Sequence, residues 1–277
     1  MPVSRSAKLL LRIGTGVTLA FLYAPLLVIA IYAFNKTRVQ TWPPSGLTLH
    51  WFSLAFSNTG ARDALLTSVE VGLAATAIAL VLGSLAAYAL ARFEFFGSNS
   101  ISFLILLPIA LPGIVTGMAL NATFTQVLGI DLSLFTVIVG HATFCIVLVF
   151  NNVVARLRRT PESLEEAAAD LGATGLRGFV DVTFPQMRSA LIAGALLAFA
   201  LSFDEVIVTT FTIGDAQTLP IWILNNLSRP RNLPIVNVVA LFVIILSLIP
   251  VWIAQRLSSD PVSAVGTVTD TPAEPVI

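Results

Sequence analysis

Six stretches of this sequence are apolar and long enough to cross a lipid bilayer, and this feature restricts the chain to one class of fold. A transmembrane α-helix needs about 20 consecutive, mostly apolar residues. The stretches that meet this requirement are 10–34, 64–91, 101–128, 133–155, 187–212 and 235–255. Because a chain in lipid must satisfy its backbone groups internally, we expect an all-α integral membrane protein with six transmembrane helices.

The composition agrees with this class and excludes others. Hydrophobic residues make up 56% of the chain and charged residues 11%, which is too little charge to cover a soluble protein of 277 residues. The net charge is zero and no basic cluster is present, which argues against nucleic-acid binding. The single cysteine excludes an internal disulfide, and the two histidines stand too far apart for a Cys/His metal site.

The positions of lysine and arginine predict the orientation, because cytoplasmic segments carry an excess of these residues. With the N-terminus inside, ten of the 15 lie in cytoplasmic segments. The other five, in external segments, are Lys36, Arg38, Arg62, Arg229 and Arg231. We therefore expect both termini in the cytoplasm, with residues 1–9 as the N-terminal segment, 10–256 as the transmembrane domain and 257–277 as a disordered polar tail.

The two long loops expected outside the membrane, 35–62 and 214–234, contain three tryptophans, Trp42, Trp51 and Trp222. Tryptophan is enriched at membrane–water interfaces, so these side chains are interpreted as interfacial anchors. A docking surface for an external partner is the alternative interpretation, and the sequence leaves both open.

The cytoplasmic loop 156–186 is polar, although it connects two strongly apolar stretches. Thr160-Pro161-Glu162 predicts a helix start, because threonine caps, proline suits the first helical position and an acid complements the dipole. Gly172 predicts the end of this helix. One helix face carries mostly small residues, which lets another protein surface approach closely; its members are Leu164, Ala167, Ala168 and Leu171. A helix lying on the membrane would carry lysine and arginine on its polar face, whereas acids are present here.

This loop carries a recognisable motif. Glu166-Ala167-Ala168, three residues, Gly172, nine residues, Val182, one residue and Phe184-Pro185 resembles the EAA loop of permease subunits in bacterial ABC importers, EAA-x3-G-x9-I-x-LP. Valine replaces isoleucine and phenylalanine replaces leucine. Other stretches, such as LPIALPGIVTGMAL and LSFDEVIVTTFT, resemble the second membrane subunit of the spermidine/putrescine permease family, in its YdcV-type branch.

The resemblance implies the type I importer permease fold, with the loop helix as a coupling helix that seats on an ATPase subunit. The residues it assigns to this contact are Glu165, Glu166, Ala167, Ala168, Asp170, Gly172 and Pro185. The implied partners are a second permease subunit, two ATP-binding cassette subunits and an external solute-binding protein, assembled in the lipid of a bacterial inner membrane. Neither Lys8 nor Lys36 lies in a G-x-x-x-x-G-K-[ST] sequence, so we expect no ATPase activity and no cofactor in this chain.

The resemblance also implies uptake of a polyamine such as putrescine or spermidine. Polyamine permeases commonly place an acid directly after the proline of the third span, but here Gly113 follows Pro112. Other small organic cations and amino-acid-like or opine-like solutes therefore stay open as alternatives.

Acids within spans are costly and point to function, and three are present: Glu70, Asp204 and Glu205. No lysine or arginine lies deep in a span to neutralise them, which suits a path for a cation. In the fifth span, small and polar residues recur at helical spacing and predict one stripe on a continuous helix; they are Gly194, Ala198, Ser202, Glu205, Thr209 and Thr212. Ser202 and Thr209 join the acids as candidate path residues. The alternative is that the acids bond to a neighbouring span or to the partner permease.

The third span contains two prolines and the fourth span a histidine. Pro108 and Pro112 each remove an amide donor, so the third span should kink, either as a gate or as a fixed bend. His141, near the middle of the fourth span, is expected to form an interhelical hydrogen bond, with titration near neutrality as the alternative.

Two other functional classes fit less well. Glu165-Glu166 resembles the EE-x3-[AR]-R start of a membrane protease family, but Ala169, Asp170 and Leu171 follow without the required arginine. The pair also lies in a loop, and no membrane-embedded histidine set completes it. A stand-alone channel or secondary carrier leaves the EAA loop unexplained.

Overall fold

The computed structural model describes residues 4–173, 175–229 and 231–258, and within these ranges the chain is built from helices, with one isolated β-bridge between Asn35 and Leu47. The α-helices are α1 (Arg5–Ala33), α2 (His50–Phe56), α3 (Thr59–Arg92), α4 (Ser98–Ala110), α5 (Gly113–Ala122), α6 (Leu134–Leu157), α7 (Ser163–Asp170), α8 (Leu176–Gly178), α9 (Phe184–Asp204), α10 (Ile207–Thr212), α11 (Leu219–Leu227) and α12 (Leu233–Ser258). Two π-helical turns, η1 (Thr123–Val127) and η2 (Phe179–Thr183), join α5 to its loop and α8 to α9.

The long apolar helices coincide with the predicted spans. Among the described residues, four helices are long and apolar enough to cross a membrane: α1, α3, α6 and the continuous helix Leu176–Asp204. The third predicted span, 101–128, is a broken pair in which α4 and α5–η1 meet at an angle of 105°. The sixth, 235–255, falls within α12, whose segment Leu233–Ser247 is apolar. The all-α membrane fold is thus confirmed, whereas the third span is not one straight helix.

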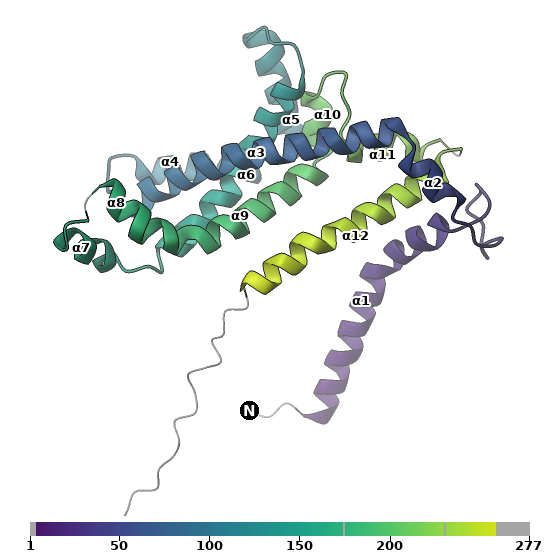
Figure 1. Cartoon of the computed structure of the whole chain (residues 1–277), viewed down its shortest axis with the longest axis horizontal. Coiled ribbons are helices and arrows are strands. Elements are labelled where there is room, and N and C mark those ends of the chain that lie inside the picture. Colours follow the sequence, from purple (N-terminus) through teal and green to yellow (C-terminus); the bar gives the residue numbers. More distant parts are fainter. Residues whose placement is uncertain (1–3, 174, 230, 259–277) are drawn as a thin grey trace, which may run out of the picture.

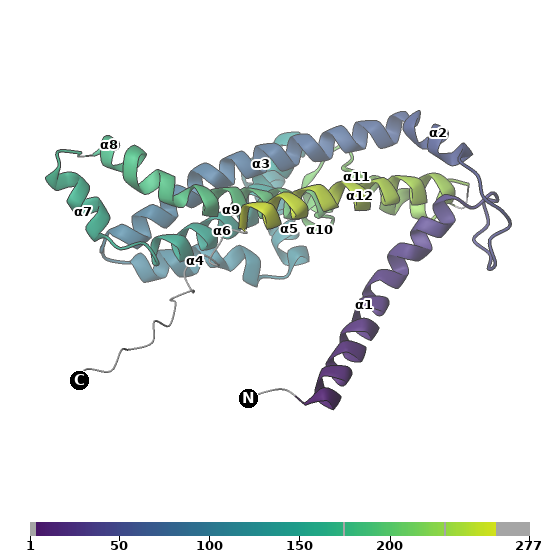
Figure 2. The same cartoon turned by 60° about the horizontal axis from the view of Figure 1, so that its bottom comes forward.

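Helices α3, α6 and α9 pack side by side and form the main core (Figures 1 and 2). Small residues line these contacts. A Cβ added at Gly83 of α3 would lie 2.9 Å from the backbone oxygen of Ile146, and one added at Gly194 of α9 would lie 3.3 Å from the Cα of Val149. Such close approach of backbones is how helices associate in lipid, where apolar burial provides no driving force.

The two ends of the bundle differ. One end, here the α7 end, carries α7 and α8; the other, the α11 end, gathers α2, α11 and the adjoining ends of α1, α3 and α12 around a second apolar cluster (Figure 1). Trp51 and Trp222 are buried in this cluster, each 6% exposed. Both are core residues of this chain, an outcome that neither interpretation of the tryptophans anticipated. Trp42 is exposed and both interpretations still apply to it.

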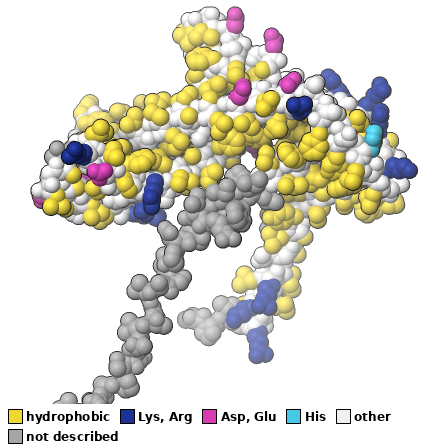
Figure 3. Space-filling model, in the orientation of Figure 1, with side chains coloured by type: hydrophobic (Ala, Val, Ile, Leu, Met, Phe, Trp, Pro, Cys, Tyr) yellow, Lys and Arg dark blue, Asp and Glu magenta, His cyan; other side chains and the backbone are white. Residues whose placement is uncertain are grey.

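Helix α1 diverges from the rest of the bundle and contacts it mainly through α12 (Figures 1 and 2). Only 6% of its most apolar window is buried within the chain. Hydrophobic side chains cover α1 and the middle of the bundle, while lysine and arginine lie at the foot of α1, at the α11 end and at the α7 end (Figure 3). The surface of α1 is therefore suited to lipid or to another apolar chain.

Candidate functional site

The helix predicted in the loop 156–186 is present as α7, and Gly172 ends it as expected. Gly172 adopts φ +88°, a left-handed conformation that glycine tolerates without a steric penalty. The N–H of Ala173 donates to the oxygen of Ala168 at 2.9 Å, the closure typical of such helix ends. The helix start was predicted too early: Glu162 is the N-cap, and the hydroxyl of Thr160 donates instead to the oxygen of Arg156.

Most of the predicted contact face on this loop is exposed in the chain. Leu171 is 89% exposed and Leu164 is 47% exposed, and Leu176 just beyond is 78% exposed. The remaining predicted residues have a similar environment: Glu166, Ala167, Asp170, Gly172 and Pro185 are exposed and Ala168 is half-buried. The helix Leu176–Asp204 continues through Pro185 by way of the π-helical turn η2.

Glu165 differs from its neighbours because it turns toward the bundle and binds Arg92. The Nε of Arg92, at the last position of α3, donates to Oε1 of Glu165 at 3.0 Å. The same guanidinium lies 3.6 Å from Glu162 and donates to the backbone oxygen of Thr160 at 3.4 Å. The side chain of Arg92 is only 7% exposed. From the sequence, Arg92 was counted only among the lysines and arginines of the cytoplasmic segments. Its contact with Glu165 was not predicted, because 73 residues separate the two and no local pattern connects them.

The third span breaks at Pro112, the second of the two predicted prolines. Helix α4 ends at Ala110, Leu111 is extended with ψ 144°, and Pro112 is the N-cap of α5. Proline disfavours the helical conformation for the residue before it, which explains the break at Leu111. Pro108 lies within α4. The predicted kink is confirmed and is larger than a bend within one helix; whether it acts as a gate stays a prediction.

The fifth span is also broken, and here the prediction of one continuous helix was wrong. Helix α9 ends at Asp204, Glu205 is extended with ψ 120°, and α10 begins at Ile207. The Glu205 carboxylate accepts a hydrogen bond from the N–H of Val208 at 2.9 Å, so it caps the first turn of α10. The predicted stripe is therefore interrupted at Glu205, although Ser202 and Thr209 on either side of the break are both buried.

His141 of α6 joins the two parts of the broken span. Its Nδ1 lies 2.8 Å from Oγ of Ser202 in α9, and its Nε2 lies 2.8 Å from Oγ1 of Thr209 in α10. The Thr209 hydroxyl donates its proton to the backbone oxygen of Glu205, so toward His141 it acts as the acceptor and Nε2 carries the proton. In this neutral imidazole, Nδ1 is unprotonated and accepts from the Ser202 hydroxyl. The predicted interhelical hydrogen bond of His141 is thus confirmed, and His141 forms two such bonds, to Ser202 and to Thr209. Ser202 and Thr209 lie in the packed interior as its partners.

The three acids of the spans have different surroundings. Asp204 and Glu70 are exposed on the surface of this chain, and Glu205 is half-buried at the helix break. Within the described ranges, every ion pair involves Arg92, so none neutralises these acids. Their carboxylates are placed where lipid, a partner chain or a solute could meet them.

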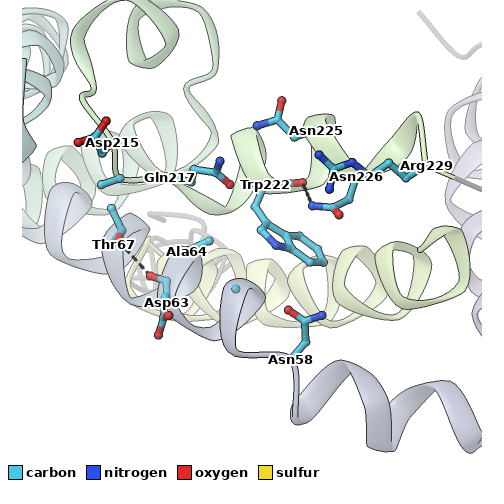
Figure 4. A pocket seen from close by; sticks show the side chains of 12 residues that line it. Asn58, Asp63, Ala64, Thr67, Asp215, Gln217, Trp222, Asn225, Asn226 and Arg229 are labelled. Atoms are coloured by element: carbon cyan, nitrogen blue, oxygen red, sulfur yellow. Dashed lines mark hydrogen bonds between the residues drawn. The ribbon is translucent and has the colours of Figure 1, made fainter. Parts of the chain in front are cut away.

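A polar pocket of about 650 Å³ opens at the α11 end (Figure 4). One wall is the first part of α3 and the other is α11 with the loop before it. Its polar lining includes Asp63, Thr67, Asp215, Gln217, Asn225 and Arg229, and Trp222 forms part of the wall. In the view of Figure 4, Asp63 and Asp215 lie toward one side and Arg229 toward the other. The sequence did not single out either aspartate, because acids are ordinary in polar loops.

Known proteins resemble this chain along most of its length. The family described as "Binding-protein-dependent transport system inner membrane component" matches residues 79–260. The chain is 34% identical over 252 residues to the putrescine transport system permease protein PotI of Escherichia coli, with 88% of each chain covered. It is 32% identical over 244 residues to the spermidine/putrescine transport system permease protein PotC of Haemophilus influenzae, covering 87% of this chain and 93% of that protein.

Solved structures agree in fold. A chain of a bacterial ABC transporter that imports the acidic polysaccharide alginate superposes with a TM-score of 0.73 at 17% identity, covering 92% of this chain and 99% of that one. A chain of the alginate transporter in complex with its pentasaccharide-bound periplasmic protein gives a TM-score of 0.70 at 15% identity, covering 91% and 93%. The apolar helices, the EAA loop and these relatives together show that this multi-pass inner-membrane chain belongs to the family of binding-protein-dependent transport system inner membrane components, as a permease subunit of an ABC importer.

Proposed function

We propose that this permease subunit forms part of a translocation path for a small organic cation, with putrescine or spermidine as the leading substrates. The observation that carries the proposal is the similarity to relatives named as putrescine and spermidine/putrescine permeases, at 34% and 32% identity over nearly nine-tenths of the chain. Identity at this level over this length makes a shared substrate class the first hypothesis to test.

The acids in the spans support a cationic substrate. Glu205 lies at the break between α9 and α10, where one carboxylate oxygen caps α10 and the other has no described hydrogen bond. Asp204 and Glu70 are exposed on this chain, and no described lysine or arginine pairs with them. Carboxylates left without cations in a low-dielectric setting favour the entry of a positively charged solute. In this proposal Ser202 and Thr209 act through His141, by holding the break in place.

Uptake is driven by ATP bound to partner subunits, since this chain has no P-loop sequence. The exposed surface around α7, with Leu171 and Gly172 at its end, is the proposed seat for an ATP-binding cassette subunit. A second permease subunit covers the exposed apolar surface of α1. Two cassette subunits and an external solute-binding protein complete the transporter. Closure of the cassettes displaces α7 and opens the spans outward, where the binding protein releases its solute.

The proposed orientation places both termini and α7 in the cytoplasm and the α11 end outside. It rests on the distribution of lysine and arginine, of which ten of 15 fall on the proposed inner side. Pro108 and Pro112 lie at the break of the third span, in a position suited to a gate.

A second substrate class is favoured by one observation. Gly113 follows Pro112 at the start of α5, where an acid is common in polyamine permeases. An amino-acid-like or opine-like solute, which carries its own carboxylate, needs fewer acids along the path.

The test is solute-stimulated ATP hydrolysis by this chain, reconstituted in liposomes with its partner permease, cassette subunits and binding protein. Putrescine or spermidine should stimulate hydrolysis, and Glu205→Gln should reduce the stimulation. Asp131→Asn, which changes an exposed loop acid, is the matched control and should have no effect. Stimulation by neutral or anionic solutes alone would overturn the cationic substrate.

A further inference from the structure

Helix α3 is the longest element of the described chain, and it runs unbroken from the α7 end to the α11 end (Figures 1 and 2). It contains 34 residues, which corresponds to about 50 Å of helix. The spans α4–α5 and α9–α10 are both interrupted, at Leu111 and at Glu205. An uninterrupted helix transmits a displacement along its axis with little internal bending, whereas a break can absorb it.

At the α7 end, two contacts attach α3 to the loop that contains the coupling helix. Arg92 binds Glu165, Glu162 and the backbone oxygen of Thr160, as described above. One turn earlier, the ring of Tyr88 meets the ring of Phe179 in η2 edge to face, with 5.4 Å between centroids. The loop connects α6 to α9 in the sequence, yet its polar anchor lies on a third helix.

At the other end, α3 is attached to the wall of the polar pocket. The hydroxyl of Ser68 accepts a hydrogen bond from the N–H of Leu219, the first residue of α11, at 2.8 Å, and both groups are buried. Gly60 lies so close to Trp222 that an added Cβ would be 3.1 Å from Nε1 of the indole. A movement of α3 along its axis therefore moves one wall of the pocket directly and strains the Ser68–Leu219 hydrogen bond and the Gly60–Trp222 packing contact with the other wall.

We propose that Arg92 is a positioning residue that couples α7 to α3, and that α3 carries the displacement of the coupling helix to the polar pocket at the opposite end. Nucleotide-driven movement of α7 then changes the width of this pocket, between α3 and α11, where solute from the binding protein would enter. The inference rests on the proposed function, since it assumes that α7 is displaced by a cassette subunit.

The chemistry of Arg92 suits this role. A guanidinium is planar, always charged and presents five donors in a fixed fork, so one side chain can hold Glu165, Glu162 and a carbonyl together. The bond to Glu165 is charge-assisted and mostly shielded from water, with Arg92 7% exposed and Glu165 24% exposed, whereas Glu162 is 65% exposed. Lysine offers a point charge without the fork and should hold the loop less firmly. The exchange Arg92→Glu with Glu165→Arg restores the ion pair with its direction reversed.

The experiment measures the pocket directly, in the complete transporter. Spin labels are attached to Thr67→Cys on α3 and Asn225→Cys on α11, which both line the pocket. Cys145, the one native cysteine of this chain, is buried, so background labelling of this chain is low; the partner subunits are used in cysteine-free form. The distance between labels is compared in the nucleotide-free and ATP-trapped states by pulsed electron paramagnetic resonance, in the parent and in Arg92→Ala. Glu94→Gln, an exposed charge two residues beyond Arg92, is the matched control.

We expect the distance to change with nucleotide in the parent and in Glu94→Gln, and not in Arg92→Ala. Hydrolysis stimulated by the loaded binding protein should fall about fivefold or more in Arg92→Ala, with basal hydrolysis retained. Arg92→Lys should be intermediate, and the exchanged pair should recover part of the coupling, which a loss of folding would not allow. Equal distance changes and equal stimulation in Arg92→Ala and the parent would overturn the proposal.

The distance measurement requires only nucleotide, so it does not depend on the identity of the solute. If putrescine fails to stimulate the parent but nucleotide still changes its label distance, the substrate proposal fails and the role of Arg92 remains supported. If nucleotide changes the label distance in the parent and in Arg92→Ala by the same amount, the role of Arg92 fails alone.

Discussion

His141 and Ser202 lie 2.8 Å apart between Nδ1 and Oγ, and this contact anchors α6 to the end of α9 immediately before the break in the fifth span. The other ring nitrogen reaches Thr209 beyond the break, so one side chain holds both parts of the span. The imidazole is fully buried, and each of its nitrogens has a partner. A buried polar network of this kind stabilises one arrangement because loss of a member leaves at least one buried polar group without its partner.

His141→Ala should destabilise the protein, because it leaves the hydroxyl of Ser202 without its buried partner and opens a cavity. We expect a loss of about 1–3 kcal/mol in the free energy of unfolding. Thermal unfolding of the purified chain in detergent measures it. His50→Ala, which removes an exposed histidine, is the control and should change little. Equal melting temperatures for the two variants would show that the network does not stabilise the break.

Glu205 combines a structural bond with a proposed role in the path, and two substitutions separate them. Glu205→Gln keeps an oxygen that can accept from the N–H of Val208, so the stability should change by no more than about 0.5 kcal/mol while cation uptake falls. Glu205→Ala also loses the cap, which should cost a further ~1 kcal/mol. Uptake assays and thermal unfolding are run on both variants. Full uptake by Glu205→Gln would leave the carboxylate with its structural role alone.

Gly172→Ala tests the left-handed end of α7, the proposed coupling helix. A side chain at φ +88° costs about 1–2 kcal/mol, although nothing lies within 4 Å of the added Cβ. We expect the chain to insert normally and the solute-stimulated ATP hydrolysis to decrease, because the loop after α7 changes its path. Gly14→Ala in α1 also meets open space but has no positive φ, so it isolates the conformational effect. Identical hydrolysis in both variants contradicts the requirement for glycine at position 172.

Gly83→Ala tests the close contact between α3 and α6. The added Cβ would lie 2.9 Å from the backbone oxygen of Ile146 and 3.0 Å from Cβ of Val149, and a backbone oxygen cannot rotate away. Overpacking of this kind should lower the free energy of unfolding by about 1–3 kcal/mol. Gly16→Ala in α1 meets no atom within 4 Å and serves as the control. A melting temperature for Gly83→Ala at or above that of Gly16→Ala would show that α3 and α6 can move apart without loss of stability.

The sequence by itself determined the features that depend on neighbouring residues. Apolar stretches longer than a bilayer is thick have only helical solutions in lipid, so the all-α fold followed from hydropathy alone. Gly172 and Pro112 act on their own backbone and on the residue next to them, which is why the end of α7 and the break of the third span were predicted at the correct positions.

Only the tertiary structure decided which distant polar groups meet. The break at Glu205 involves neither glycine nor proline; it is held by the Glu205 carboxylate and by His141, which comes from another helix. Arg92 binds Glu165 although 73 residues separate them in the sequence, and the polar pocket lies between α3 and α11. A local pattern encodes the conformation of its own segment, whereas the partner of a buried charge or hydroxyl depends on which helices lie side by side and in which rotation.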